Sequence, residues 1–474
     1  MKYPKYAVLG LLWVTGVAVA QPTTYILDSV VLPESAIKSS NVVPVPLGAR
    51  VQTHFVVLPE LDLEKTLASD EASGPALQIG TARAVAATTS VAQTQSALQW
   101  TALPSGQQVA AINIQSTGAY GLRAGVLVDS LPDGALLRIY SQEHPDAIVE
   151  RSGVEVNALL AQNRKAGETG TAANTWWTPD VGTGDATVEV VLPAGAAADA
   201  LRISIPVVSH IYQNLSLPTE AEWAETTKID TSGSCNLDAS CASDYQAERN
   251  AVARMLFTEA DGKSYFCTGT LVNNTKEDFT PYFLTANHCI STQSVASSLQ
   301  TTWFYRSSSC NSGVPGVNST LRNAGATLLY ATSTTDSSFL QLNEMPPAGV
   351  SLAGWDARTE VQIGDEVYGL HHPRGSLLKY SVGAVLGYAS CRDSVPNFTV
   401  FSCSTADSNS NFYSVRWGLG TTEPGSSGSS LFRNDRVVAT LYGGSASCLA
   451  PGATDYYGRF DKVFSNRIWR WLAS

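Results

Sequence analysis

Three stretches of the sequence carry residue types that could together activate a hydroxyl group for attack on a carbonyl carbon. Ser427 lies in Gly425-Ser-Ser-Gly428, a turn of small residues where the N–H groups of Gly425 and Ser427 could stabilise a negative oxygen. His288 follows a strand-like apolar run, and Asp336 leads another. A serine becomes a good nucleophile when an imidazole takes its proton and a carboxylate orients that imidazole. These residues therefore form a candidate catalytic triad.

Each of these residues also has a simpler interpretation. A Gly/Ser run is often a loop, a lone histidine is often buried structure, and a lone aspartate is often a turn residue or a helix cap. Among the serines of its loop, only Ser427 has a glycine two positions before it and another directly after it. The competing serines and aspartates are Ser426, Ser429, Ser430, Asp261, Asp278 and Asp365.

The order of these motifs resembles that of the chymotrypsin-type serine proteases. Thr-Ala-Asn-His-Cys comes first, an Asp before an apolar run follows, and Gly-Ser-Ser-Gly comes last. This order is more closely similar to that of the bacterial lysyl endopeptidases of the Achromobacter protease I type. The resemblance covers about residues 229–474, and nothing comparable covers the first half of the chain. Further matching stretches are Ser234-Cys-Asn236, Cys267-Thr-Gly-Thr-Leu-Val-Asn-Asn274, Ala353-Gly-Trp-Asp356, His371-His-Pro373 and Thr422-Glu-Pro-Gly-Ser-Ser-Gly-Ser429.

The resemblance implies a serine endopeptidase that works through an acyl-enzyme, with two six-stranded β-barrels in residues 229–474. Ser427 would be the nucleophile, His288 the general base and Asp336 the carboxylate that orients it. The N–H groups of Gly425 and Ser427 would form the oxyanion hole. A closing helix is also expected from the residues themselves, because apolar side chains recur at helical spacing near the C-terminus. These are Val463, Phe464, Ile468, Trp469 and Leu472.

Residues near the end of the chain are expected to choose the substrate. Asp455 matches the aspartate that binds the substrate lysine in the family, and a carboxylate at the base of a narrow pocket would favour a cation. The backbone of Tyr442, Gly443 and Gly444 could pair with an extended substrate as an added strand. Tyr442 stands where the best-known family member has a histidine. The alternatives are that Asp455 is a loop residue, and that arginine is accepted as well as lysine.

All eight cysteines lie beyond Gly233, which in an exported chain indicates disulfides. Zinc is not expected, because no Cys-x2-Cys pair occurs. Neighbouring His371 and His372 would point to opposite faces of an extended segment, so no metal and no cofactor are expected there either. The resemblance implies the pairs Cys235–Cys448, Cys241–Cys310 and Cys267–Cys289, which leaves Cys391 and Cys403 for each other.

The first half of the chain is expected to be removed in stages. Residues 1–20 are typical of a signal peptide, with two lysines, an apolar run and small residues before Gln21, although a membrane anchor is the alternative. The resemblance makes residues 21–228 a propeptide. We expect an irregular region over residues 21–97, an antiparallel β-sandwich over about residues 98–217 and a polar linker over residues 218–228.

The processing site is predicted between Lys228 and Ile229, where a lysine-specific enzyme could release its own propeptide. Ser426 occupies the position where chymotrypsin-type zymogens carry an aspartate that pairs with a new N-terminal amine. Activation by such an ion pair is therefore not expected. The hypothesis instead is that a blocking pro-segment is removed.

Composition narrows the class of protein and its partners. The formal net charge is -11, which argues against nucleic acid and anionic membranes as partners. A charged content of 15% suits a secreted, all-β protein. We expect a secreted monomer that acts on lysine-containing proteins or peptides and also binds its own propeptide. The alternative from another class is an inactive protease homologue that binds glycans, through Trp100, Trp176 and Trp177 of the sandwich.

Overall fold

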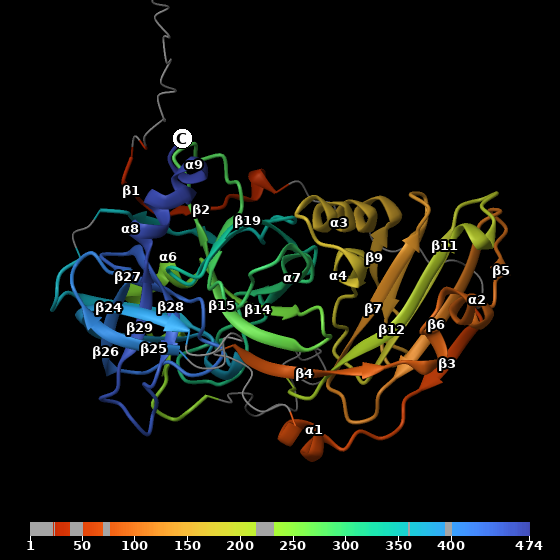
Figure 1. The fold of residues 1–474 in the computed structure, drawn as a ribbon, viewed down its shortest axis with the longest axis horizontal. Coiled ribbons are helices and arrows are strands. Elements are labelled where there is room, and N and C mark those ends of the chain that lie inside the picture. The colour runs from red at the N-terminus through yellow and green to blue at the C-terminus, as the bar shows by residue number, and fades with distance from the viewer. Residues whose placement is uncertain are drawn as a thin grey trace, which may run out of the picture.

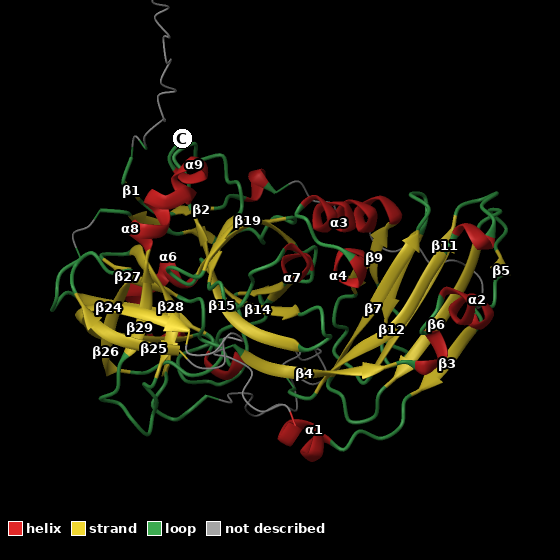
Figure 2. Cartoon of the chain, in the orientation of Figure 1, coloured by secondary structure: helices red, strands yellow, loops and turns green. Residues whose placement is uncertain are grey.

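The computed structural model describes residue 22 and residues 24–37, 51–69, 76–214, 232–358, 361–393 and 401–474. Figure 1 shows two bodies side by side, an N-terminal domain of residues 51–214 and a two-barrel domain of residues 232–474. Strands dominate both, and the helices are short (Figure 2). The all-β class is confirmed. In the described ranges, no helix has both the length and the apolar character needed to cross a bilayer.

The N-terminal domain is a sandwich of two sheets. One sheet has the order β3-β6-β11-β8-β9, with β5 on β6. Its strands are β3 (Thr53–Val57), β5 (Thr101–Ala102), β6 (Gln108–Gln115), β8 (Leu136–Tyr140), β9 (Val149–Ser152) and β11 (Asp185–Leu192). The facing sheet has the order β10-β7-β12-β4, with β4 (Leu77–Ala84), β7 (Gly121–Ser130), β10 (Thr175–Trp177) and β12 (Arg202–Ile211). These strands pair antiparallel, except that β3 runs parallel to β6.

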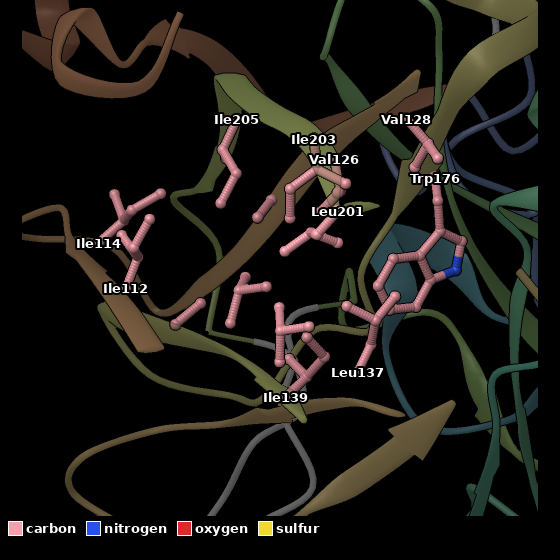
Figure 3. Close-up of a cluster of buried hydrophobic side chains, with 14 of the residues drawn as sticks. Ile112, Ile114, Val126, Val128, Leu137, Ile139, Trp176, Leu201, Ile203 and Ile205 are labelled. Atoms are coloured by element: carbon pink, nitrogen blue, oxygen red, sulfur yellow. The ribbon is translucent and has the colours of Figure 1, made fainter. Parts of the chain in front are cut away.

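The core of the sandwich is formed by alternate residues of its strands, as expected where one face of each sheet is buried. Figure 3 shows Ile112 and Ile114 of one sheet facing Ile203 and Ile205 of the other. Trp176 fills one end of this core and is 5% exposed. Trp177 is also buried and Trp100 is partly buried, so packing accounts for the tryptophans that raised the glycan-binding alternative.

The interpretation of residues 21–97 as irregular is wrong for the part that the structure describes. This region forms α1 (Leu63–Ser69) and α2 (Val91–Ala97) as well as β3 and β4. Strand β4 has small residues and little alternation, so its sequence predicts no strand. It is nevertheless extended because it pairs on both sides, with β12 and with strand β15 (Ser264–Val272) of the two-barrel domain. Partner strands override weak intrinsic preference.

The first barrel of the two-barrel domain surrounds Phe257, Phe283, Trp303 and Leu340. Besides β15, its strands are β14 (Val252–Thr258), β16 (Tyr282–Thr285), β17 (Gln300–Trp303), β18 (Thr320–Arg322), β19 (Ala326–Thr332) and β20 (Ser337–Leu342). Strand β15 pairs with β14 and β16, and β16 pairs with β20. The pairing of β16 with β20 brings the end of β16 next to the start of β20, where His288 and Asp336 lie.

The second barrel closes on itself in the order β28-β27-β23-β24-β26-β29-β28. Its strands are β23 (Glu366–His371), β24 (Lys379–Asp393), β26 (Phe412–Leu419), β27 (Ser430–Arg433), β28 (Arg436–Gly444) and β29 (Asp455–Arg459). A helical segment follows, with α8 (Phe460–Val463), a π-helical turn at Phe464–Ile468 and α9 (Trp469–Leu472). Its apolar side chains pack against Trp355 and Phe339 in one core cluster. This is the closing helix that the spacing predicts.

Smaller elements complete the part of the chain that the structure describes. Four further helices are α3 (Gly153–Lys165), α4 (Gly170–Asn174), α6 (Gln246–Arg249) and α7 (Gln293–Ser297). Among the described residues, six further strands are β1 (Ile26–Leu27), β2 (Val30–Val31), β13 (Leu237–Asp238), β21 (Ser351–Leu352), β22 (Gly354–Asp356) and β25 (Phe401–Ala406), the last of which pairs with β24. Three disulfides join the pairs that the resemblance implies, Cys235–Cys448, Cys241–Cys310 and Cys267–Cys289, and a fourth joins the two remaining cysteines, Cys391 and Cys403.

Candidate active site

His288 and Asp336 form a buried pair at the end of the first barrel. Strands β16 and β20 are antiparallel with Thr285 opposite Ser338, so the residues that follow β16 meet those that precede β20. The Nδ1 atom of His288 lies 2.7 Å from one carboxylate oxygen of Asp336, and the backbone N–H of His288 donates to the other at 2.9 Å. These two bonds fix the ring and leave its Nε2 atom as the site where a proton can be taken up.

The Nε2 atom of His288 is buried and has no hydrogen-bond partner among the described residues. A buried polar atom without a partner costs free energy, and such atoms are common where a substrate or a reacting group will bind. Asp336 itself adopts a positive φ of 46°, which is uncommon for a residue other than glycine. Strain of this kind is typical of functional sites.

The disulfide Cys267–Cys289 ties strand β15 to the residue that follows His288. Both sulfurs and the histidine ring lie within 4.8 Å of one another, in an arrangement that could suggest a metal site. The two sulfurs are bonded to each other and cannot act as thiolate ligands, so the disulfide is a clamp on the histidine loop.

The loop that carries Ser427 is held against the middle of β15 and the end of β16. The N–H of Thr268 donates to the carbonyl oxygen of Ser427 at 2.8 Å, and the Thr268 hydroxyl donates to that of Gly425 at 2.9 Å. Gly428 has a φ of 81°, and a Cβ there would lie 2.8 Å from the backbone nitrogen of Ala286, two residues before His288. Only glycine permits this approach.

Ser427 therefore lies at the junction of the two barrels, on the side where His288 emerges. The described hydrogen bonds do not include one between the Ser427 hydroxyl and His288. Such bonds are often long in enzymes without substrate and shorten when substrate binds. The structure thus joins His288 to Asp336 directly and brings Ser427 to them through the backbone contacts of its loop.

The residue before Ser427 is held by a buried histidine. The Oγ atom of Ser426 lies 2.9 Å from Nδ1 of His371, and the N–H of Glu423 donates to the same Oγ at 3.2 Å. Burial lowers the pKa of His371 to about 3, so its ring is neutral. His372 is a structural neighbour whose Nδ1 donates to the carbonyl oxygen of Ser376 at 2.8 Å. The sequence suggested that this His-His pair is not a metal site, but not that it supports the nucleophile loop.

Glu423 links this loop to the start of the two-barrel domain. Its carboxylate accepts hydrogen bonds from the N–H of Gly233 at 2.8 Å and from the side-chain amide of Asn236 at 2.7 Å. Its other oxygen lies 2.8 Å from Nε of Arg374. The predicted processing residues Lys228 and Ile229 lie outside the described residues.

Asp455 is fully buried at the start of β29. Its Oδ2 atom accepts hydrogen bonds from the indole N–H of Trp417 at 2.7 Å and from the hydroxyl of Thr422 at 2.6 Å. Burial raises the pKa of this carboxyl group. Within the described ranges no cationic side chain pairs with it. A Cβ at Gly444 would lie 2.2 Å from Oδ1 of Asp455, so glycine keeps this side of the carboxylate open.

Aromatic rings pack beside the pair of His288 and Asp336. The ring of Tyr442 lies 5.9 Å from that of His288 and 4.2 Å from that of Phe401, measured between centroids. The ring of Phe412 lies 5.4 Å from the ring of Tyr442. Phe401, Trp417 and Thr422 were not identified from the sequence, because nothing in their local pattern reveals contacts across such long separations.

Comparison with known proteins agrees with this geometry. The family model of the lysyl endopeptidase C-terminal domain matches residues 229–458, and that of the lysyl endopeptidase N-terminal domain matches residues 57–212. A lysyl endopeptidase of Pseudomonas aeruginosa is 34% identical over 395 residues, which are 79% of this chain and 78% of the relative. This chain belongs to the lysyl endopeptidase family. It is a serine endopeptidase, and protein or peptide chains are its substrates.

More distant similarities cover parts of the chain. The secreted RxLR effector protein 73 of Plasmopara viticola is 29% identical over 217 residues, 43% of this chain and 48% of that protein. The active form of the Rv3671c protease from M. tuberculosis aligns with a TM-score of 0.33 at 17% identity, covering 52% of this chain and 92% of that one. The MamO protease domain from Magnetospirillum magneticum aligns with a TM-score of 0.31 at 11% identity, covering 47% and 98%.

Proposed function

We propose that this chain is the precursor of an exported endopeptidase that cleaves after lysine through an acyl-enzyme on Ser427. The observation that carries the proposal is the buried pair of His288 and Asp336, whose free ring nitrogen lies at the junction that holds the Ser427 loop. A serine, an imidazole and a carboxylate in these positions supply the three roles that acyl transfer needs.

The first half of the reaction acylates the enzyme. His288 takes the proton of the Ser427 hydroxyl through Nε2 while the oxygen attacks the carbonyl carbon of the substrate. The negative charge that develops on the carbonyl oxygen is stabilised by the N–H groups of Gly425 and Ser427. His288 then gives its proton to the leaving amine, and the peptide bond breaks. Asp336 stabilises the imidazolium formed in between, because it lies 2.7 Å from Nδ1.

The second half hydrolyses the acyl-enzyme. A water molecule gives a proton to Nε2 of His288 and attacks the ester carbon. The bond between that carbon and the Ser427 oxygen then breaks, and this oxygen takes the proton from His288. The new carboxylate leaves and the enzyme is restored. A general base acts only in its unprotonated form, so a rate of hydrolysis that is flat between about pH 5 and about pH 9 would contradict this assignment.

The preference for lysine rests on Asp455. A carboxylate that is buried among neutral donors is poorly solvated, so an entering ammonium group restores the lost interaction. A neutral side chain would leave the carboxylate unpaired. Tyr442, Gly443 and Gly444 would pair with the residues of the substrate that precede the lysine. Cleavage after both lysine and arginine is the runner-up, since arginine also carries a cation.

The precursor hypothesis joins the sequence to the contacts between the domains. Residues 1–20 would direct export, residues 21–228 would form the propeptide, and cleavage after Lys228 would release residues 229–474. Four disulfides suit a protein that is exported to an oxidising compartment. Long-range β pairing is slow, so a covalently attached folding partner is useful for a double barrel.

Labelling with a fluorophosphonate, which reacts with activated serines, tests the nucleophile. We expect labelling of the processed enzyme and none in Ser427→Ala. A panel of peptides that differ only in the residue before the scissile bond tests the specificity. Unlabelled wild-type protein would favour an inactive homologue instead, and equal rates after lysine and arginine would favour the runner-up.

A further inference from the structure

The first described residues of the chain lie on the two-barrel domain and not on the N-terminal domain. We call residues 24–37 the strap; it contains β1, β2 and a 3-10 turn at Glu34–Ala36. Strand β1 pairs antiparallel with β22, and β2 pairs antiparallel with β21. Figure 1 shows both strands beside α8 and α9, far from the sandwich.

One side chain of the strap enters the core of the first barrel. Leu32 is 1% exposed and belongs to the same buried cluster as Val350 and Leu352. Its backbone is held on both sides, since its N–H donates to Val350 at 2.8 Å and its carbonyl oxygen accepts from Gly349 at 3.1 Å. The neighbouring Val31 is 56% exposed, so the two residues separate the buried face of the strap from its solvent face.

The two-barrel domain has a glycine where the strap passes. A Cβ at Gly354 would lie 2.4 Å from the carbonyl oxygen of Leu27 and 2.8 Å from the backbone nitrogen of Ser29. The φ of Gly354 is not positive, so its own backbone does not demand glycine. The close approach of the strap does, and the N–H of Gly354 donates to the Ser29 hydroxyl at 3.1 Å.

Polar contacts hold the strap to the same domain. The Arg436 Nε atom lies 2.9 Å from a carboxylate oxygen of Asp28, and the side-chain amide of Asn273 donates to the Asp28 carbonyl oxygen at 3.0 Å. The N–H of Ala357 donates to the Tyr25 carbonyl oxygen at 2.8 Å. Within the described ranges, none of the strap's hydrogen bonds reaches the catalytic pair, Ser427 or Asp455. The strap can therefore remain in place without obstructing substrate.

We propose that the strap is a structural part of the two-barrel domain and stays bound to it as a separate peptide after the N-terminal domain is cut away. The cutting rests on the proposed function. Lys38 follows the strap directly, as Lys228 precedes the two-barrel domain. Hydrolysis of the bonds after both lysines, with one water consumed at each, leaves a new carboxylate on the strap and a new amine at residue 229. The mature enzyme is then a complex of two chains.

The binding is tested without relying on catalysis. The full chain carrying Ser427→Ala receives two recognition sequences for an unrelated site-specific protease, one between residues 38 and 51 and one between residues 214 and 232. After both cuts, gel filtration followed by mass spectrometry under denaturing conditions measures how much strap peptide elutes with the two-barrel domain. We expect about one peptide per domain, and a peptide absent from that peak overturns the proposal.

Matched variants identify the contact that holds the peptide. Leu32→Asp should reduce the retained peptide by about tenfold or more, because it places a charge in the barrel core, whereas Val31→Asp on the solvent face should retain it. Arg436→Ala, on the surface of the two-barrel domain, should release the peptide a few times faster because it removes the partner of Asp28. Equal retention in Leu32→Asp and Val31→Asp would overturn the proposal.

The wild-type enzyme supplies the last measurement. Secreted and self-processed protein should contain a peptide that ends at Lys38, and a processed enzyme without any strap peptide contradicts retention. If the wild-type chain makes no cut at all, the proposed function fails while the Ser427→Ala experiment still decides whether the strap binds.

Discussion

The Oγ atom of Ser426 lies 2.9 Å from Nδ1 of His371, so a buried neutral imidazole holds the residue directly before the proposed nucleophile. The other ring nitrogen of His371, Nε2, lies 3.4 Å from the Oγ atom of Ser381. His371 ends strand β23, and the contact therefore fixes the loop of Ser427 to the frame of the second barrel. We therefore predict that no new N-terminal amine is needed to order this loop.

This contact predicts that His371 is a positioning residue. In His371→Asn and in Ser426→Ala, the oxyanion-hole N–H groups should be less well placed, so kcat should fall about 10- to 100-fold with little change in KM. The pH dependence of kcat should keep its midpoint, because His371 does not exchange the catalytic proton. Ser390→Ala, at an exposed serine of β24, is the control. A fall confined to KM would show that the loop binds substrate instead.

The buried histidines also predict how stability depends on pH. Burial lowers the pKa of His371 and His372 to about 3, while an unfolded histidine titrates near 6.5. The unfolded chain then binds more protons between these values. The stabilisation is complete above about pH 6.5 and is lost as the pH falls toward about 3, by up to about 1.4 kcal/mol per pH unit for each ring.

Urea unfolding of the Ser427→Ala protein at about pH 7, 5 and 4 measures this effect without self-digestion. In the Ser427→Ala background, His371→Asn should reduce the slope of unfolding free energy against pH, since one titrating ring is removed. Carboxylates contribute the same background to both proteins. Parallel slopes would mean that the ring is not kept neutral by the fold.

Asp455 is predicted to lower stability while it provides specificity. Because burial raises the pKa of its carboxyl group, the ionised form is less stable folded than unfolded at neutral pH. Asp455→Asn should therefore raise the melting temperature, and kcat/KM on lysyl peptides should fall on the order of 10²- to 10³-fold.

Fluorophosphonate labelling of Asp455→Asn should persist, because the variant leaves Ser427 and His288 untouched. Asp407→Asn, at an exposed aspartate of the same barrel, should change neither property. If lysine preference survives in Asp455→Asn, another group binds the substrate cation.

The sequence predicts best where function constrains local residue order. The small residues around Ser427 and the apolar runs beside His288 and Asp336 reveal the candidate triad before any contact is known. The groups that support it are different. Trp417 and Thr422 reach Asp455 across separations of 38 and 33 residues, and no local pattern encodes such contacts.

The same limit applies to the fold. Strands such as β6 and β11 are predictable because alternate apolar residues along each of them line the core of the sandwich. Strand β4 is not, since Gly80 and Ala82 bring little apolar surface and the strand is formed only between β12 and β15. The periodicity of apolar residues predicts a strand whose side chains fill the core of its own domain. It does not predict a strand such as β4, which is formed by backbone pairing between two domains.

The interface between the two domains also contains a buried charged side chain, Arg123, and its removal should weaken the interface. Arg123 of β7 is buried and donates to the hydroxyl of Thr258 at 2.7 Å and to the carbonyl oxygen of Ser298 at 2.6 Å, both in the two-barrel domain. Burial lowers the pKa of this guanidinium group to about 10, so it remains charged at neutral pH. Arg123→Met keeps much of the volume but leaves buried acceptors unpaired, at about 1–3 kcal/mol each.

Once the linker of the Ser427→Ala protein is cut by the unrelated protease, the N-terminal domain of Arg123→Met should leave the two-barrel domain about tenfold faster or more, as followed by gel filtration over time. Arg202→Met is the matched control, because Arg202 is 57% exposed and faces Asp129 of its own domain. Equal dissociation rates in the two variants would mean that Arg123 does not stabilise the interface. The pairing of β4 with β15, which is the same in both variants, would then hold the domains together.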